Sequence, residues 1–309
     1  MTTDEIAELQ RKNYNATVAS LRFPNPELMI VRIKPDAPVA SHRAGQYSTL
    51  GLGHWEPRAP DCQEENPKPG DEKKLIRRAY SISCSILDDQ GNLPAQANAE
   101  WLEFYIVLVR KAEKAPPALT PRLFMLREGA RIFLGEKIAG HFTLEPVKPT
   151  DNVIFLSTGT GEAPHNYMLW ELLAKGHQGK ILAACCVRYK QDLGYAGIHD
   201  ELQTRYPNYT YLKLTTRESD TVNQKVYIQD LITSGQLEER LADSLDPART
   251  HVYLCGNPKM IGAAEIDKAS GATVFPQPPG VIEILSKRGF QADQPSLKLK
   301  GNIHVEEYW

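Results

Sequence analysis

Hydrophobic and polar positions follow different patterns in the two halves of the chain. Between residues 17 and 147, short segments alternate in part and are separated by Pro and Gly; they are residues 17–23, 28–34, 45–52, 77–85 and 101–109, with two further short strands between 130 and 144. Such segments predict antiparallel strands of a barrel or a sandwich. A polar helix is expected over residues 1–16. A short helix is expected at Thr120, whose hydroxyl can cap it while Pro121 fills its first position.

From Asp151 onward, continuous apolar runs alternate with helical segments. The runs are residues 151–156, 180–189, 209–217 and 251–256; helices are expected over 165–176, 197–206, 227–241 (one or two) and after Asn257. Continuous apolar strands between helices indicate a parallel sheet covered on both faces. We therefore predict two domains, an all-β domain over residues 1–148 and a Rossmann-like α/β domain over 149–309.

One segment of the first half, residues 54–76, fits neither pattern. It carries four prolines, Gly70, charges of both signs and little apolar content. This composition predicts a long surface loop. A tolerated insertion is the preferred interpretation, and a partner-docking loop or a lid is the alternative.

Composition narrows the class of protein. The chain has 309 residues, a net charge of −2 and 41% hydrophobic residues. The charge does not favour a nucleic-acid partner, no apolar run is long enough to span a membrane, and the acidic N-terminus is not signal-like. The five cysteines show no metal-site spacing, so we predict no metal and a reducing, cytoplasmic setting with at most one functional thiol.

A glycine turn separates the strand at 151–156 from the helix that follows it. It contains Thr158, Gly159, Thr160 and Gly161, and Pro164 stands where the third glycine of a full dinucleotide fingerprint would lie. A strand, a glycine turn and a helix start present backbone N–H groups to an anion such as a nucleotide phosphate. The alternative is an ordinary strand-to-helix turn.

Two arginines occur at the ends of predicted strands, where a parallel sheet binds its ligands. Arg188 takes the place where an NAD site usually has a carboxylate, and Arg217 follows the next strand. Guanidinium groups bind phosphate bidentately, so the pair favours NADP(H) over NAD(H). Solvated surface arginines are the alternative. Cys255 ends a third strand and is either near a ligand or only buried.

Several motifs together resemble those of the ferredoxin–NADP reductase family, and of its bacterial branch in particular. They are Arg78-Ala79-Tyr80-Ser81, Tyr105-Ile106-Val107, Leu119-Thr120-Pro121-Arg122-Leu123, Thr158-Gly159-Thr160-Gly161, Cys255-Gly256-Asn257-Pro258-Lys259-Met260 and the final Tyr308-Trp309. The resemblance covers nearly the whole chain apart from the N-terminal stretch and residues 54–76. It implies an FAD-binding antiparallel β-barrel followed by an NADP-binding α/β domain.

The resemblance also implies residue roles. Arg78, beside Ala79, would hold the FAD pyrophosphate, Tyr80 would stack on the isoalloxazine, and Ser81 would hydrogen-bond near its N5. The path of the ribityl and phosphate groups would be lined by Tyr105, Ile106, Val107, Ala118, Leu119 and Thr120, with Thr160 touching the flavin. The NADP site would comprise Thr158, Gly159, Gly161, Arg188, Arg217, Lys225, Cys255, Gly256, Asn257 and Met260. Tyr308 and Trp309 would cover the flavin, and Ser81, Cys255 and Tyr308 would be catalytic.

The implied activity is hydride transfer between NADP(H) and FAD, with single electrons passing to or from ferredoxin or flavodoxin. A monomer is expected. A flavin reductase component serving an oxygenase is one alternative, and a nucleotide-binding interaction protein without turnover is another. Glu162 and His165 replace residues that are commonly apolar in this family, and a carboxylate in the glycine turn could repel a pyrophosphate.

Overall fold

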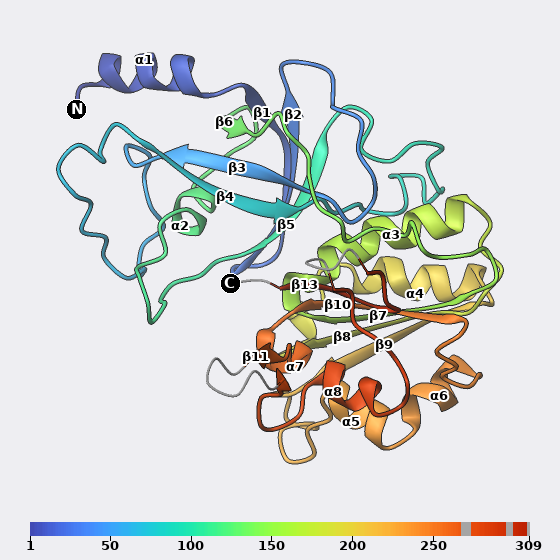
Figure 1. Cartoon of the computed structure of the whole chain (residues 1–309). Helices are drawn as coiled ribbons and strands as arrows, with labels where there is room; N and C mark the ends of the chain where they lie inside the picture. Colours follow the sequence, from blue (N-terminus) through green and yellow to red (C-terminus); the bar gives the residue numbers. More distant parts are fainter. Residues whose placement is uncertain (267–272, 295–298, 308–309) are drawn as a thin grey trace. The chain divides into compact units, whose positions relative to one another are not determined.

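A computed structural model describes residues 1–266, 273–294 and 299–307 of the chain, which divides into two compact units (Figure 1). Unit 1 comprises Met1–Ser85 and Pro94–His141, and unit 2 comprises Ile86–Leu93 and Phe142–Trp309. The domain boundary proposed between residues 148 and 149 stays a prediction. No helix in the described ranges combines the length and the apolar character needed to cross a membrane.

Unit 1 is built on a six-stranded antiparallel sheet. Its elements are α1 (Thr3–Asn13), β1 (Ala16–Asn25), β2 (Leu28–Pro35), β3 (Tyr47–Gly53), β4 (Leu75–Ser81), β5 (Leu102–Val107), α2 (Thr120–Leu123) and β6 (Arg131–Leu134). The strand order is β4-β3-β6-β1-β2-β5. The predicted antiparallel architecture is confirmed. The sheet is barrel-like but not closed, since its two edges are joined by an isolated bridge between Ser83 and Glu103 and not by a continuous strand pairing.

Two local details of unit 1 differ from the prediction. The second short strand near Gly140 is reduced to one bridge between Tyr47 and Ala139, because Gly140 has a φ of 120° and leaves the extended conformation. Thr120 begins α2 and does not cap it. Its hydroxyl instead accepts a hydrogen bond from the backbone N–H of Val109, at 3.2 Å.

Unit 2 is an α/β unit around a parallel five-stranded sheet. Its elements are β7 (Asn152–Thr158), η1 (Gly159–Gly161), α3 (Glu162–Ala174), β8 (Ile181–Val187), η2 (Lys190–Asp192), α4 (Ala196–Arg205), β9 (Tyr209–Thr215), α5 (Ile228–Thr233), α6 (Gln236–Leu241), β10 (Thr250–Gly256), α7 (Pro258–Ile261), β11 (Glu265–Ile266), β12 (Thr273–Val274), α8 (Val281–Ser286) and β13 (Ile303–Glu307). The strand order is β13-β10-β7-β8-β9 and every pairing is parallel, which confirms the predicted parallel sheet. Helices α3 and α4 cover one face of it, and α5, α6 and α8 cover the other (Figure 1). The prediction did not include α8 or β13.

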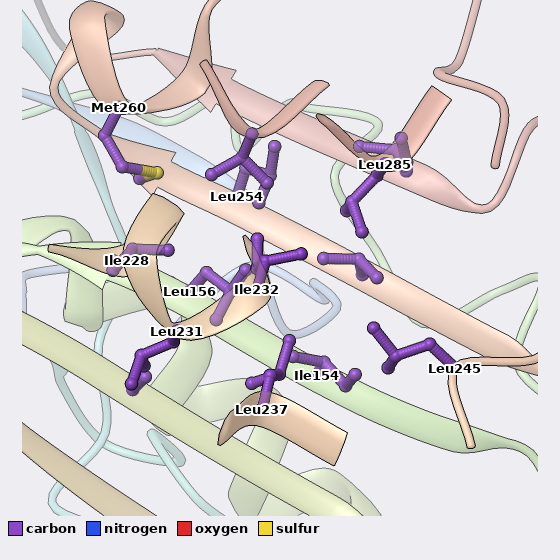
Figure 2. Packing of buried hydrophobic residues seen from close by; sticks show 14 of the residues in the cluster. Ile154, Leu156, Ile228, Leu231, Ile232, Leu237, Leu245, Leu254, Met260 and Leu285 are labelled. Atoms are coloured by element: carbon purple, nitrogen blue, oxygen red, sulfur yellow. The ribbon is translucent and has the colours of Figure 1, made fainter. Parts of the chain in front are cut away.

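The face of this sheet that carries α5 to α8 packs as an apolar core (Figure 2). Ile154 and Leu156 of β7 and Leu254 of β10 are fully buried, and they meet Ile232 of α5 and Leu285 of α8. Alternate residues of a strand point to one face, so these strands supply a continuous apolar layer. This packing holds the strands in place, and with them the residues that follow their carboxyl ends.

We expect Leu254→Ala to lower the free energy of unfolding by about 3 kcal/mol, because it removes buried methyl groups and leaves a cavity. Equilibrium unfolding in urea measures the change. Leu299→Ala is the matched control, because Leu299 is 57% exposed, and it should shift stability by no more than about 0.5 kcal/mol. Equal losses in the two variants would contradict the assigned core.

Candidate functional site

The glycine turn of unit 2 is packed tightly against the end of a neighbouring strand. A Cβ atom on Gly161 would lie 2.2 Å from the backbone oxygen of Cys255, and one on Gly256 would lie 2.2 Å from Thr158 Oγ1. The backbone N–H of Asn257 also donates to Thr158 Oγ1 at 2.7 Å. The ends of β7 and β10 are thus joined at the point where the strand order changes direction, which is where parallel sheets bind nucleotides.

The other side of the turn is open. Gly159 has a φ of 53° and no atom within 4 Å of the position of a Cβ, and Thr160 is half-buried. The turn runs directly into α3, and the N–H of Glu162 donates back to the carbonyls of Gly159 and Thr160. An open glycine turn at a helix N-terminus suits an anionic group.

Glu162, the first residue of α3, is buried behind this turn. Its Oε1 accepts a hydrogen bond of 2.6 Å from the hydroxyl of Tyr211 and lies 3.3 Å from Nε2 of His199. The carboxylate is 3% exposed, so it is held among polar groups of α4 and β9. Its burial answers the concern that it would stand free in the turn and repel a pyrophosphate.

His165 and Asn166 line the same region, one turn further along α3. Together with Glu162 and His199 they border a cavity of about 10 Å³, which has room for one water molecule. Burial lowers the pKa of His165 to about 3, so the imidazole is neutral at physiological pH. Glu162 and His165 therefore belong to a buried polar cluster with Asn166 and His199.

Arg188 and Arg217 come together at the ends of adjacent strands. Val187 of β8 pairs with Thr215 of β9, and the backbone N–H of Arg217 donates to the carbonyl of Arg188 at 2.9 Å. Both side chains are exposed, and neither forms an ion pair with another described residue. Lys225 is exposed on the segment between β9 and α5, and no contact within the described ranges ties it to this pair.

Cys255 is fully buried at the end of β10, followed by the exposed Asn257 and the buried Met260 of α7. Its partner in the parallel register with β13 is Glu306. Burial raises the pKa of Glu306 to about 7. Glu306 was not predicted from the sequence; the signal available was its place just before the aromatic end of the chain. Tyr308 and Trp309 lie outside the described residues.

We expect Glu306→Gln to become more stabilising relative to the wild type as pH rises. The folded pKa of about 7 exceeds the ordinary value of 4.5, so the protonated carboxyl favours folding below pH 4.5 and this contribution is lost as pH rises through 7. The difference should reach on the order of 2 kcal/mol at pH 8. Urea unfolding at pH 5 and pH 8 measures it. Glu239→Gln, at an exposed position of α6, should show no such trend.

In unit 1 the predicted flavin residues lie on the two edge strands. Arg78, Ala79, Tyr80 and Ser81 end β4, and Tyr105, Ile106 and Val107 end β5. An isolated antiparallel bridge between Ser83, two residues beyond β4, and Glu103 of β5 brings these two edge segments together. The predicted segments therefore border one seam of the sheet.

The exposure of these residues differs along the seam. Arg78 and Ala79 are exposed, Tyr80 is half-buried and Ser81 is 5% exposed. Burial raises the pKa of Tyr80, so its hydroxyl stays protonated. On β5, Tyr105 and Ile106 are buried while Val107 is 40% exposed.

The third predicted flavin segment joins the same seam. Ala118 and Leu119 precede α2, and the hydrogen bond from Val109 to Thr120 ties this segment to the end of β5. Leu119 is buried, whereas Ala118 and Thr120 are half-buried. The seam thus combines the exposed guanidinium of Arg78, the protonated phenol of Tyr80 and the buried hydroxyl of Ser81 with the partly apolar edge strand β5.

Comparison with known proteins places these features in a family. Residues 155–265 match the family model described as the oxidoreductase NAD-binding domain. The chain is 30% identical over 228 residues to the flavodoxin/ferredoxin–NADP reductase of Buchnera aphidicola subsp. Baizongia pistaciae, covering 73% of this chain and 78% of that protein. It is 29% identical over 226 residues to the Escherichia coli K12 protein of the same name, with 73% and 78% covered.

A solved structure shows the same fold over nearly the whole chain. It is the ferredoxin NADP+ reductase of Neisseria gonorrhoeae with bound FAD and NADP. The TM-score is 0.68 at 19% identity, with 96% of this chain and 98% of that chain covered.

Proposed function

The chain belongs to the flavodoxin/ferredoxin–NADP reductase family, and we propose that it binds NADP(H) at the strand ends of unit 2 and FAD along the seam of unit 1. It is an FAD-dependent oxidoreductase. The observation that carries the proposal for NADP(H) is the arginine pair, Arg188 and Arg217. The two residues are joined by a backbone hydrogen bond, and both are exposed at the same ends of the parallel strands as the glycine turn.

The donor set of unit 2 fits an NADP molecule. The open turn at Gly159 offers backbone N–H groups to the pyrophosphate. Two guanidinium groups that form no ion pair with any described residue suit the 2′-phosphate. Gly161 and Gly256 allow the turn to approach the end of β10, so that Cys255 would lie near the nicotinamide. The buried Glu162 does not compete for the arginines.

The donor set of unit 1 fits FAD. Arg78 would hold the pyrophosphate, the protonated Tyr80 would stack on the isoalloxazine, and the Ser81 hydroxyl would donate near its N5. When bound, FAD accepts a hydride and releases electrons singly. The protein's part is to orient the two cofactors and exclude water.

Glu306 adds a proton-holding group to unit 2. With a pKa of about 7 and a place opposite Cys255, it can exchange a proton at physiological pH. We propose that this carboxyl, together with the buried thiol of Cys255, borders the nicotinamide.

We propose ferredoxin or flavodoxin as the electron partner, supported by the names of the relatives. A cytoplasmic monomer is our proposal for its setting, and the odd number and the spacing of the five cysteines support a reducing compartment. A flavin reductase component serving an oxygenase is the alternative, and reduction of flavodoxin or ferredoxin by the purified protein distinguishes the two.

The test of the proposed function is the absorbance of the purified, FAD-loaded protein mixed anaerobically with NADPH and separately with NADH. We expect rapid bleaching by NADPH and slow bleaching by NADH. Equal bleaching would keep the reductase and reject the role of the arginine pair. A protein that cannot take up FAD would overturn the proposal.

A further inference from the structure

The loop of residues 54–76 forms several hydrogen bonds with the segment around the start of α2. The backbone N–H of Ala59 donates to the carbonyl of Pro121 at 2.8 Å, and Arg58 Nη2 donates to the carbonyl of Pro117 at 3.0 Å. These acceptors flank the predicted flavin residues Ala118, Leu119 and Thr120. These hydrogen bonds attach the loop to the predicted flavin segment, which a merely tolerated insertion does not require.

A buried ion pair lies at the centre of this contact. Arg122 Nη1 is 2.7 Å from Oε2 of Glu65, and the two side chains are 4% and 11% exposed. The same nitrogen donates to the carbonyl of Ala118 at 2.7 Å, while Nη2 donates to the carbonyl of His54 at 3.1 Å. One guanidinium therefore ties the start and the middle of the loop to the flavin segment.

Glu65 is the group that holds this guanidinium in place. It is also 3.4 Å from Nε of Arg58, the residue that binds the carbonyl of Pro117. Because the Arg122 side chain is buried and both of its terminal nitrogens have partners inside the protein, Arg122 acts as a brace and not as a phosphate ligand. Removing the carboxylate would leave two arginines around a buried site without their common counter-charge.

A second set of bonds attaches the same loop to the chain before the flavin segment. The backbone N–H of Gln63 donates to the carbonyl of Arg110 at 2.8 Å, and its Oε1 accepts from the N–H of Ala112 at 3.1 Å. Arg110 Nη1 in turn donates to the carbonyl of Pro60 at 3.1 Å. Residues 58–65 thus bond to the chain on both sides of Ala118–Thr120.

We propose that Glu65, acting through Arg122 and Arg58, is a positioning residue for FAD: it holds Ala118–Thr120 in the conformation that binds the cofactor. This inference rests on the proposed binding of FAD by that segment. A segment ordered before binding loses less conformational freedom when the ligand arrives, so the brace tightens FAD binding without touching FAD. The loop is then a buttress for the flavin segment and not a lid or a docking loop.

The test is the dissociation constant of FAD for the full-length apoprotein, measured by titration of flavin fluorescence. We expect Glu65→Gln to weaken FAD binding by about 10- to 100-fold, while kcat and the Michaelis constant for NADPH at saturating FAD stay within about twofold. Glu64→Gln is the matched control, since Glu64 is an exposed neighbour on the same loop, and it should bind FAD as the wild type does.

A second variant separates positioning from general loss of stability. In Glu65→Gln/Arg122→Met the unpaired buried guanidinium of Arg122 is removed, so unfolding stability should recover at least in part, yet FAD binding should stay weak because the tie to Ala118 is absent. Recovery of FAD affinity together with stability would overturn the inference, as would wild-type affinity in Glu65→Gln. Failure of the wild-type protein to bind FAD would instead overturn the proposed function.

Discussion

Replacing Arg188 with alanine is expected to raise the Michaelis constant for NADPH by about 10- to 100-fold and to leave that for NADH within about twofold. The exposed guanidinium follows β8, and the carbonyl of Arg188 accepts from the N–H of Arg217. A charge-assisted bond to a 2′-phosphate can form only with NADPH, because NADH carries a hydroxyl at that position. Steady-state kinetics with ferricyanide as the acceptor measures both constants.

Two further variants sharpen this expectation. Arg217→Ala should act in the same direction, and the double variant should show less than the product of the two effects because both groups would bind one phosphate. Arg240→Ala, at an exposed position of α6, is the matched control and should leave both cofactors unaffected. Equal losses with NADPH and NADH would remove the arginine pair from the 2′-phosphate site.

Replacing Gly161 with alanine is expected to have the largest effect on unit 2. The new Cβ would lie 2.2 Å from a backbone oxygen of Cys255, so β7 and β10 would have to separate at their ends. We expect a loss of unfolding free energy of about 2–3 kcal/mol. Binding of NADP+ should weaken by more than about tenfold, because the N–H groups of the turn, which we propose bind the pyrophosphate, would be displaced. Thermal unfolding and calorimetric titration with NADP+ measure the two effects.

Gly159→Ala is the control for that variant. Gly159 has a positive φ of 53° but open space around it, so alanine there should cost only about 1 kcal/mol of backbone strain. Its effect on stability should therefore be smaller than that of Gly161→Ala. If the two alanines destabilised the protein equally, the contact with Cys255 would have no part in the result.

The sequence predicts the parts of the fold that depend on local pattern. The continuous run Ile181–Val187 could be identified as a buried strand without knowledge of its neighbours, because every residue in it is apolar. Placing Arg188 and Arg217 at ligand-facing strand ends required only that their strands be parallel. The hydrogen bond between them depends on the register of β8 with β9, which only the structure gives.

The residues that sequence reasoning missed depend on contacts between distant parts of the chain. β13 escaped prediction because Ile303–Glu307 is only five residues long, has no continuous apolar run and ends in two glutamates. The raised pKa of Glu306 follows from its burial in β13, which no local pattern reports. Glu65 likewise lies in a segment of loop composition, and only the fold brings it to Arg122.

The central strand pair of unit 2 has a consequence for the order of folding. β7 and β8 are connected by a single helix and are close in the chain. β10 pairs with β7 across a much longer stretch, since Thr250 lies opposite Asn152. Contacts between distant residues form late because closing a long loop is entropically costly. We therefore expect the glycine turn to acquire its contact with Cys255 only after β7, β8 and β9 have associated. During refolding, the recovery of NADP+ binding should then lag behind the recovery of the circular-dichroism signal.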